Sequence, residues 1–283
     1  MIRVTKDFSN LPDNLVRGVG DYNHASVRAA LDDIYNQKCC YCEQKIEDFE
    51  VEHYRPQRGS RSRIKEHHGY PWLRLEWSNL LWSCSTCNAG VGAKHTKFPI
   101  TYAANRITAP SENPADNRAD SAFLLAEGAL LIHPEIENPE DYLTMLFDGR
   151  LSAIDNNSKG LATIDVCKLN RDHLQLEKRK ATIDDYCRKM IDNVLHVGRV
   201  IVEHNIARTD RKPLLLMFLE PTFNDIKANC AAKAEFALLH RVFYQQFDTF
   251  VTQNVNVRQE LSPSSIQALQ NAFSSYKTEQ EAP

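Results

Sequence analysis

Two Cys-x-x-Cys pairs constrain the fold of this chain more than any other feature. The first pair is Cys39 and Cys42, the second is Cys84 and Cys87, and 41 residues separate them. Each pair forms a tight turn that points both sulfurs the same way, so two pairs can supply the four thiolates of a tetrahedral zinc site. We therefore predict a structural Zn²⁺ that joins both ends of the intervening segment.

The composition indicates a globular protein. Of the 283 residues, 42% are hydrophobic and 25% are charged, and the net charge is only −3, so any nucleic-acid contact must come from a local patch. No apolar run reaches the length of a membrane span and residues 1–6 lack the apolar core of a signal peptide, so we expect a cytoplasmic protein with no membrane partner. In that reducing compartment the eight cysteines favour metal ligation over disulfides. The four without metal spacing are predicted to be small buried residues: Cys40, Cys167, Cys187 and Cys230.

The segment between the cysteine pairs contains an acid beside a histidine, Glu52 and His53. Residues 51–54 are predicted to form a strand. Because side chains alternate along a strand, Glu52 and His53 are expected on opposite faces, which argues against both ligating one metal. Asn79 precedes the second cysteine pair, and Asn88 follows it directly.

A basic run follows the histidine. Residues 55–75 contain six lysines and arginines against one acid, Glu66. A charge run is usually only a solvated loop, but its place beside Glu52 and His53 favours a patch that binds the phosphates of a nucleic acid. The predicted contact residues in this run are Arg55, Arg58, Arg61, Arg63 and Lys65.

Taken together, these residues resemble the HNH, or ββα-metal, endonucleases of the cysteine-containing kind. Three pieces carry the resemblance: Glu52-His53, the segment from Asn79 to Cys84, and Cys84-x-x-Cys87-Asn88. No piece is specific alone, but their order and spacing match together.

The resemblance implies a role for each matched residue. His53 is expected to be the general base, and Asn79 to orient it. Glu52 and Asn88 are expected to hold a catalytic Mg²⁺ or Mn²⁺. Lys94 is the candidate for a phosphate-binding lysine that relatives carry closer to the asparagine, so the roles of His95 and Lys97 stay open.

Residues 131–141 and 163–171 are similar to the continuation found in HNH nuclease subunits of Septu and retron-associated antiviral defence systems. The first segment contains Leu-Ile-His-Pro and Asn-Pro-Glu-Asp, and the second contains Thr-Ile and Leu-Asn-Arg. This resemblance implies an effector subunit that cleaves nucleic acid, DNA in preference to RNA. It also implies a partner, a separate ATPase subunit (PtuA-like), because the chain has no nucleotide-binding glycine loop.

The rest of the chain predicts an α+β fold with three regions. An HNH domain is expected over residues 1–110, a connecting strand and hairpin region over 111–170, and a helical domain over 171–283. Apolar spacing predicts helices at residues 24–36, 171–205, 225–253 and 262–276. Strands are predicted at residues 123–125 and 130–132, and a hairpin at Asp148-Gly149.

The predicted fold class is therefore α+β, with a ββα-metal module held together by a four-cysteine zinc site, a small β-hairpin region and a mainly helical C-terminal part. Two alternatives remain. One is a non-cleaving, zinc-containing module that binds nucleic acid, and the other is a scaffold subunit of such a complex. Neither requires Glu52, His53 and Asn88 together, so their joint presence favours the nuclease.

Overall fold

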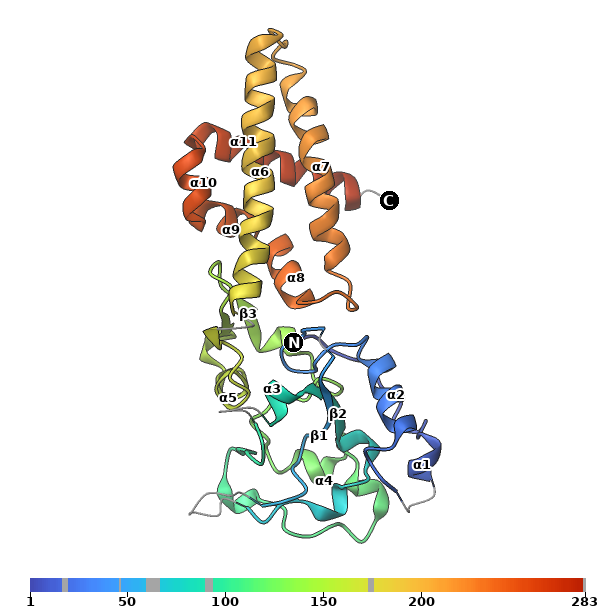
Figure 1. Ribbon diagram of the computed structural model, residues 1–283. Coiled ribbons are helices and arrows are strands. Elements are labelled where there is room, and N and C mark those ends of the chain that lie inside the picture. Colours follow the sequence, from blue (N-terminus) through green and yellow to red (C-terminus); the bar gives the residue numbers. More distant parts are fainter. Residues whose placement is uncertain (17–19, 46, 60–66, 90–93, 173–175, 282–283) are drawn as a thin grey trace. The chain divides into compact units, whose positions relative to one another are not determined.

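The computed structural model describes residues 1–16, 20–45, 47–59, 67–89, 94–172 and 176–281. The chain forms two compact units (Figure 1). The first contains Met1–Thr144 and Leu151–Arg171, and the second contains Met145–Arg150 and Asp172–Pro283. The predicted division into three regions has other boundaries than these two units and remains a prediction.

An antiparallel pair of strands organises the first unit. Strand β1 (Phe49–His53) pairs with β2 (Leu80–Cys84), so that Val51 lies opposite Trp82 and His53 opposite Leu80. Every residue of β2 is buried. The short helix α3 (Ser85–Asn88) follows β2 directly, which gives the order β, β, α along the chain. This order places the acid-histidine pair and the second cysteine pair on neighbouring elements.

The helix predicted at residues 24–36 is confirmed as α2 (Ala25–Ile34). The side chain of His24 caps it by accepting a hydrogen bond from the backbone N–H of Ser26. Val27 and Leu31 form its buried stripe, and the helix packs on both β1 and β2. Other elements of this unit among the described residues are α1 (Asp13–Val16), α4 (Ala122–Leu125), α5 (Ser158–Val166), and the 3-10 turns Pro71–Leu73, Trp77–Asn79, Ala103–Asn105, Pro114–Asn117, Pro139–Asp141 and Ile154–Asn156.

The two strands predicted at residues 123–125 and 130–132 are wrong. The first segment lies in helix α4, because the hydroxyl of Ser121 accepts a hydrogen bond from the N–H of Leu124 and starts a helical turn. Leu131 and Ile132 are buried but lie outside any strand. An isolated antiparallel bridge between Ile100 and Ala129 precedes them, so the apolar run is buried beside an extended segment without forming a regular strand.

The hairpin predicted at Asp148-Gly149 is confirmed. Strands β3 (Leu143–Met145) and β4 (Leu151–Ala153) form a two-stranded sheet. Gly149 has a φ of 83°, a left-handed conformation that favours glycine, and the N–H of Leu146 donates to the carbonyl of Arg150.

The second unit is helical. Its helices are α6 (Glu177–Glu203), α7 (Arg211–Asn229), α8 (Ala237–Gln245), α9 (Phe247–Gln253), α10 (Val255–Glu260) and α11 (Pro263–Glu281). Helices α6 and α7 run side by side (Figure 1). Aromatic rings from α7, α8, α9 and α11 fill the core, and the rings of Phe247 and Phe273 stack with centroids 3.8 Å apart.

The predicted helix starts and ends in this unit were right in part. The hydroxyl of Ser262 caps α11 as expected. The helical pattern predicted over residues 225–253 is confirmed for most of these residues but is not one helix, because α7 ends at Asn229 and the chain turns at Phe236, which has a φ of 51°, before α8 and α9. Pro221 lies inside α7 and does not end it. Leu195 of α6 is exposed.

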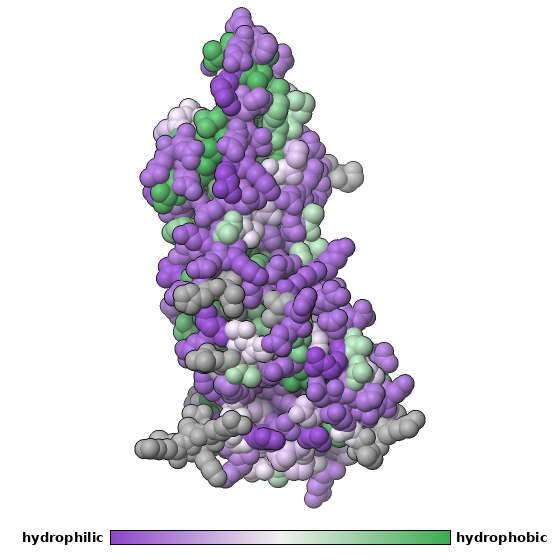
Figure 2. Space-filling view, in the orientation of Figure 1, coloured by the Kyte–Doolittle hydropathy of each residue, from purple (hydrophilic) through white to green (hydrophobic). Residues whose placement is uncertain are grey.

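The structure is therefore mainly helical with two small sheets. Figure 2 shows hydrophobic surface among hydrophilic surface on the helices of the second unit. Its exposed apolar side chains include Val202 of α6 and Met217 of α7. Among the helices in the described residues, none combines the length and the apolar character that a membrane crossing requires.

Candidate functional site

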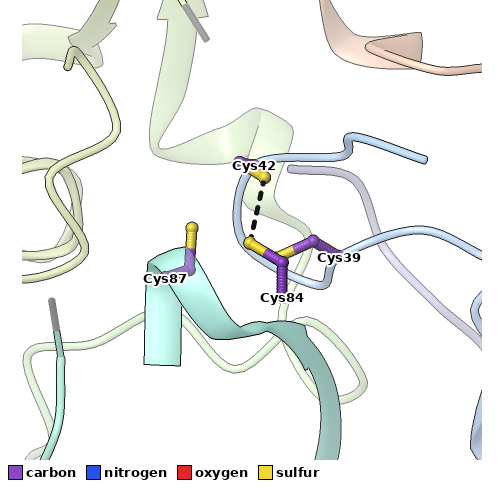
Figure 3. Close-up of side chains that lie close together, drawn as sticks. All are labelled: Cys39, Cys42, Cys84 and Cys87. Atoms are coloured by element: carbon purple, nitrogen blue, oxygen red, sulfur yellow. Dashed lines mark hydrogen bonds between the residues drawn. The ribbon is translucent and has the colours of Figure 1, made fainter. Parts of the chain in front are cut away.

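The four cysteines of the two pairs meet in one cluster. Cys39 and Cys42 lie in a turn before β1, Cys84 ends β2, and Cys87 lies in α3 (Figure 3). All four are buried, and their sulfurs lie within 4.8 Å of one another. Tetrahedral zinc with Zn–S bonds of about 2.3 Å requires sulfurs about 3.8 Å apart. The Sγ atoms of Cys42 and Cys84 are 3.8 Å apart, so the cluster fits a zinc ion.

Backbone hydrogen bonds hold the first cysteine turn against β2. The N–H of Cys40 donates to the carbonyl of Trp82, and the N–H of Glu43 donates to the carbonyl of Cys39. Burial, followed by hydrogen bonding with Cys39, raises the pKa of the Cys42 thiol well above its ordinary value. Four thiolates so close together repel one another, and a bound cation would offset that repulsion.

A pocket of about 510 Å³ lies beside this cluster. Glu52 and His53 from β1 and Asn88 from α3 all line it, together with Tyr22 and Arg58. Both residues border this pocket, but their side chains have different partners: the Glu52 carboxylate contacts Lys94 and Tyr41, and the His53 ring contacts the Arg74 carbonyl and Tyr22. His95, whose role was open, also lines this pocket.

His53 is held in one orientation and in its neutral form. Its Nε2 lies 3.0 Å from the carbonyl oxygen of Arg74, and because a carbonyl can only accept, Nε2 carries the proton. Nδ1 is then the nitrogen that can accept a proton. The ring of Tyr22 packs edge-on against the imidazole, with centroids 4.6 Å apart. Burial lowers the pKa of His53 to about 4, so the imidazole is neutral at physiological pH.

Glu52 is buried and paired with an internal cation. The ammonium of Lys94 lies 2.5 Å from Glu52 Oε1, and the Tyr41 hydroxyl donates to the same oxygen at 3.2 Å. Lys94 also donates to the carbonyl of His53 at 3.0 Å and is fully buried. Burial raises the pKa of Glu52, and the charge of Lys94 acts against that rise. Glu52 Oε2 accepts no hydrogen bond from the described residues.

The environment of Lys94 corrects the prediction that it binds nucleic acid. A cation with no exposed surface and a carboxylate partner does not reach a phosphate. Arg55 is corrected for the same reason: it is buried, its Nε lies 2.9 Å from Glu127 Oε2, and it donates to the carbonyl of Leu124. Both residues form buried ion pairs inside the first unit.

Asn79 also contacts other atoms than expected. Its side-chain oxygen accepts from the N–H of Arg55 at 2.8 Å, and its amide donates to the carbonyls of Arg55 and Leu73. The hydrogen bond that orients the His53 ring comes from the Arg74 carbonyl. Asn79 therefore fixes the backbone just after His53 and does not contact the ring itself.

Asn88 and Arg58 remain available to a ligand. The Asn88 amide donates to Glu50 Oε2 at 2.8 Å, and its side-chain oxygen accepts no hydrogen bond from the described residues. Arg58 is exposed at the edge of the pocket. Three other predicted contact residues, Arg61, Arg63 and Lys65, lie outside the described residues.

Several residues of the site carried no signal in the sequence. Tyr22 comes from a turn-rich segment far from the cysteines, and Arg74 acts through its carbonyl, which every residue has. Tyr41 lies inside the first Cys-x-x-Cys, a motif that predicts a role for its two cysteines but not for the residues between them. Only long-range packing brings these three residues to Glu52 and His53.

The fold and site define a protein with a cluster of four buried cysteines that could hold a metal ion, next to a pocket lined by an acid, a histidine and an asparagine. The chain is similar to a protein described as Septu protein PtuB from Bacillus mycoides (strain KBAB4), with 31% identity over 175 residues, which are 60% of this chain and 55% of the relative. A second Septu protein PtuB, from Bacillus thuringiensis, is 28% identical over 149 residues, or 51% of this chain and 41% of the relative. The chain thus matches about half the length of these curated relatives. No protein-family model matches the chain, and no solved structure matches it significantly.

Proposed function

We propose that this chain is a metal-dependent HNH endonuclease, with DNA as the expected substrate, acting as the effector subunit of a Septu-type antiviral defence complex. One observation carries the proposal: Glu52, His53 and Asn88 line a single pocket beside a cluster of four cysteines. The similarity to two proteins named Septu protein PtuB supports the assignment to such a system. Zinc in the cysteine cluster would be structural, because all four of its positions are filled by protein sulfurs.

His53 serves as the general base in this proposal. The Arg74 carbonyl holds Nε2 and leaves Nδ1 to accept the proton of an attacking water. The Tyr22 ring limits rotation of the imidazole, so Nδ1 keeps a constant direction. A base that is already neutral and oriented loses little entropy when the reaction begins.

Two oxygens of the pocket suit a hard divalent cation. Glu52 Oε2 and the side-chain oxygen of Asn88 would hold Mg²⁺ or Mn²⁺, with water and phosphate oxygens completing the shell. When bound, the ion supplies positive charge to the phosphate as negative charge develops there. Arg58 binds a neighbouring phosphate of the substrate from the edge of the pocket.

Plasmid cleavage tests the proposal. Wild-type protein, alone and with its ATPase partner, is incubated with supercoiled plasmid in Mg²⁺ or without divalent ions, and an RNA transcript is tested in parallel. We expect Mg²⁺-dependent nicking that His53→Ala abolishes and that His68→Ala, a change at an exposed histidine, leaves intact. Nicking that persists in His53→Ala would contradict the assigned base.

A second candidate function has one observation in its favour. Lys94 already neutralises Glu52, as it would in a site that no longer binds a metal. The chain would then be a zinc-containing subunit that binds nucleic acid, or a scaffold, without cleaving. Zinc-loaded wild-type protein that binds DNA but never cuts, even with its partner, would favour this alternative.

The helical unit is proposed to bind the ATPase subunit. A groove of about 490 Å³ between α6, α7 and α11 has an apolar floor that includes Val197, Ile201 and Leu215. Three exposed cations edge it, Arg208, Arg211 and Lys212, and none of them forms an ion pair with a residue that the structure describes. Apolar floor and free positive charge together fit an acidic protein segment with apolar side chains better than a phosphate backbone.

Charge reversal tests this part of the proposal. Changing Arg208, Arg211 and Lys212 together to Glu should abolish co-purification with the proposed ATPase subunit. The matched control reverses Arg188 and Lys189 on α6, whose charges Asp185 already pairs. Equal recovery of the ATPase with both variants would exclude the groove as the binding site.

A further inference from the structure

The segment Leu169-Asn170-Arg171, which the proposed cleavage does not use, is fixed at each of its three residues. Leu169 is fully buried, and its N–H donates to the carbonyl of Ile164. The Asn170 side chain forms a pair of hydrogen bonds with the backbone of Leu151, at 2.8 and 2.9 Å. These contacts hold Arg171 in a defined place at the end of the first unit.

Arg171 reaches the second cysteine pair from 84 residues away. Its Nη2 lies 3.3 Å from the Sγ of Cys87, and its Nη1 donates to the carbonyl of Thr86 at 2.6 Å. Nη2 also lies 3.4 Å from the carbonyl of Cys167. The guanidinium therefore contacts both the backbone of α3, at the Thr86 carbonyl, and the sulfur of Cys87.

The charge of a four-thiolate zinc site explains why a contact with arginine would stabilise it. Four thiolates and one Zn²⁺ carry a net charge of about −2, so a nearby permanent cation stabilises the loaded site. An N–H donated to a thiolate also fixes the direction of the sulfur and reduces its reactivity. Arginine suits both purposes because its planar group offers several donors and stays charged.

We propose that Arg171 is a positioning residue of the four-cysteine metal site, holding the Cys87 thiolate and offsetting the charge of the tetrathiolate. The inference rests on zinc occupying the cluster and is independent of cleavage. The Leu-Asn-Arg segment then links strand β4 to the metal site within the first unit.

Metal release from the full chain tests the proposal. Zinc-loaded wild type, Arg171→Met and Arg171→Lys are mixed with a chromogenic chelator, and the rate of zinc transfer is recorded. Loss of a group that supports a metal ligand commonly costs about 10- to 100-fold in metal affinity. We expect release from Arg171→Met to be at least about tenfold faster, with Arg171→Lys between it and wild type. Lys168→Met is the matched control, because Lys168 pairs with exposed Asp165 and should release zinc at the wild-type rate.

Cobalt spectra separate a metal-site effect from general loosening of the fold. In Co²⁺-substituted protein, loss of the N–H donated to Cys87 should shift the sulfur-to-cobalt charge-transfer band, which a purely structural role would leave in place. Unchanged release rates and an unchanged band in both Arg171 variants would overturn the proposal. Wild-type protein that binds neither Zn²⁺ nor Co²⁺ would overturn it together with the zinc assignment, whatever the cleavage assay shows.

Discussion

Substituting Lys94 by Met should destabilise the first unit strongly, because it leaves Glu52 buried without its counter-charge. Methionine has a similar length and keeps the apolar contacts of the lysine stem. What it removes is the ammonium that lies 2.5 Å from Glu52 Oε1 and 3.0 Å from the carbonyl of His53. The Tyr41 hydroxyl, at 3.2 Å, is then the remaining hydrogen-bond donor to Glu52 among the described residues.

The burial of the pair sets the magnitude. Its side chains are 0% and 3% exposed, for Lys94 and Glu52. Removing one member of a buried ion pair costs about 3–5 kcal/mol of unfolding free energy, whereas an exposed pair contributes about 0–1 kcal/mol. We therefore expect Lys94→Met to cost about 3–5 kcal/mol. Replacing both residues by Met should cost less than the single change, because no buried charge is left unpaired.

Urea unfolding followed by tryptophan fluorescence measures this cost. The three tryptophans, Trp72, Trp77 and Trp82, all lie in the first unit, so the signal reports that unit and avoids assuming that both units unfold together. The buffer contains no added Mg²⁺ or Mn²⁺, so that no divalent ion can replace the missing ammonium.

Two other ion pairs supply the controls. Lys6 and Glu135 form a buried pair 3.0 Å apart in the same unit, away from the pocket, so Lys6→Met should cost a similar amount. Arg118 and Asp120 form an exposed pair, so Arg118→Met should cost less than about 1 kcal/mol. If Lys94→Met behaves like Arg118→Met, or the double Met variant is no more stable than the single one, the buried pair is not formed in solution.

Three further predictions concern the metal cluster, the pocket and the core. Cys39→Ser should remove zinc and unfold the first unit, because structural zinc contributes about 10–16 kcal/mol of apparent binding energy; mass-spectrometric metal analysis checks this, and a variant that keeps one zinc per chain would contradict it. Arg58→Ala should weaken DNA binding and reduce the slope of log affinity against log salt by about 1; anisotropy titrations at several salt concentrations measure the slope, and no change would remove Arg58 from the phosphate contacts. Burial lowers the pKa of His133 well below its ordinary value, so the unfolded chain binds this proton first and stability falls as the pH drops below about 6.5. His133→Asn should make that fall shallower in urea unfolding between about pH 7 and 5, and an equally steep fall would show that another group causes it.

The sequence correctly predicted the helices and turns that depend on interactions between residues close together in the chain. Helix α2 followed from apolar spacing, the β3–β4 turn from an Asp-Gly pair, and the start of α11 from Ser262 before a proline. Residue composition alone did not decide two other segments. Phe123 to Leu125 has strand composition but became helical at a serine cap, and Pro221 was accommodated inside α7.

The sequence by itself determined which side chains are the candidates for the site, because cysteine spacing and the order of Glu52, His53 and Asn88 are properties of the chain. Only the tertiary structure decided what those side chains face. Arg55 and Lys94 look like surface cations in the sequence, yet the carboxylates of Glu127 and Glu52 hold them inside the first unit. The physical reason is that a charged side chain is stable in the interior only beside an opposite charge. Here that charge comes from a distant part of the chain, and the sequence does not show which distant residues become neighbours.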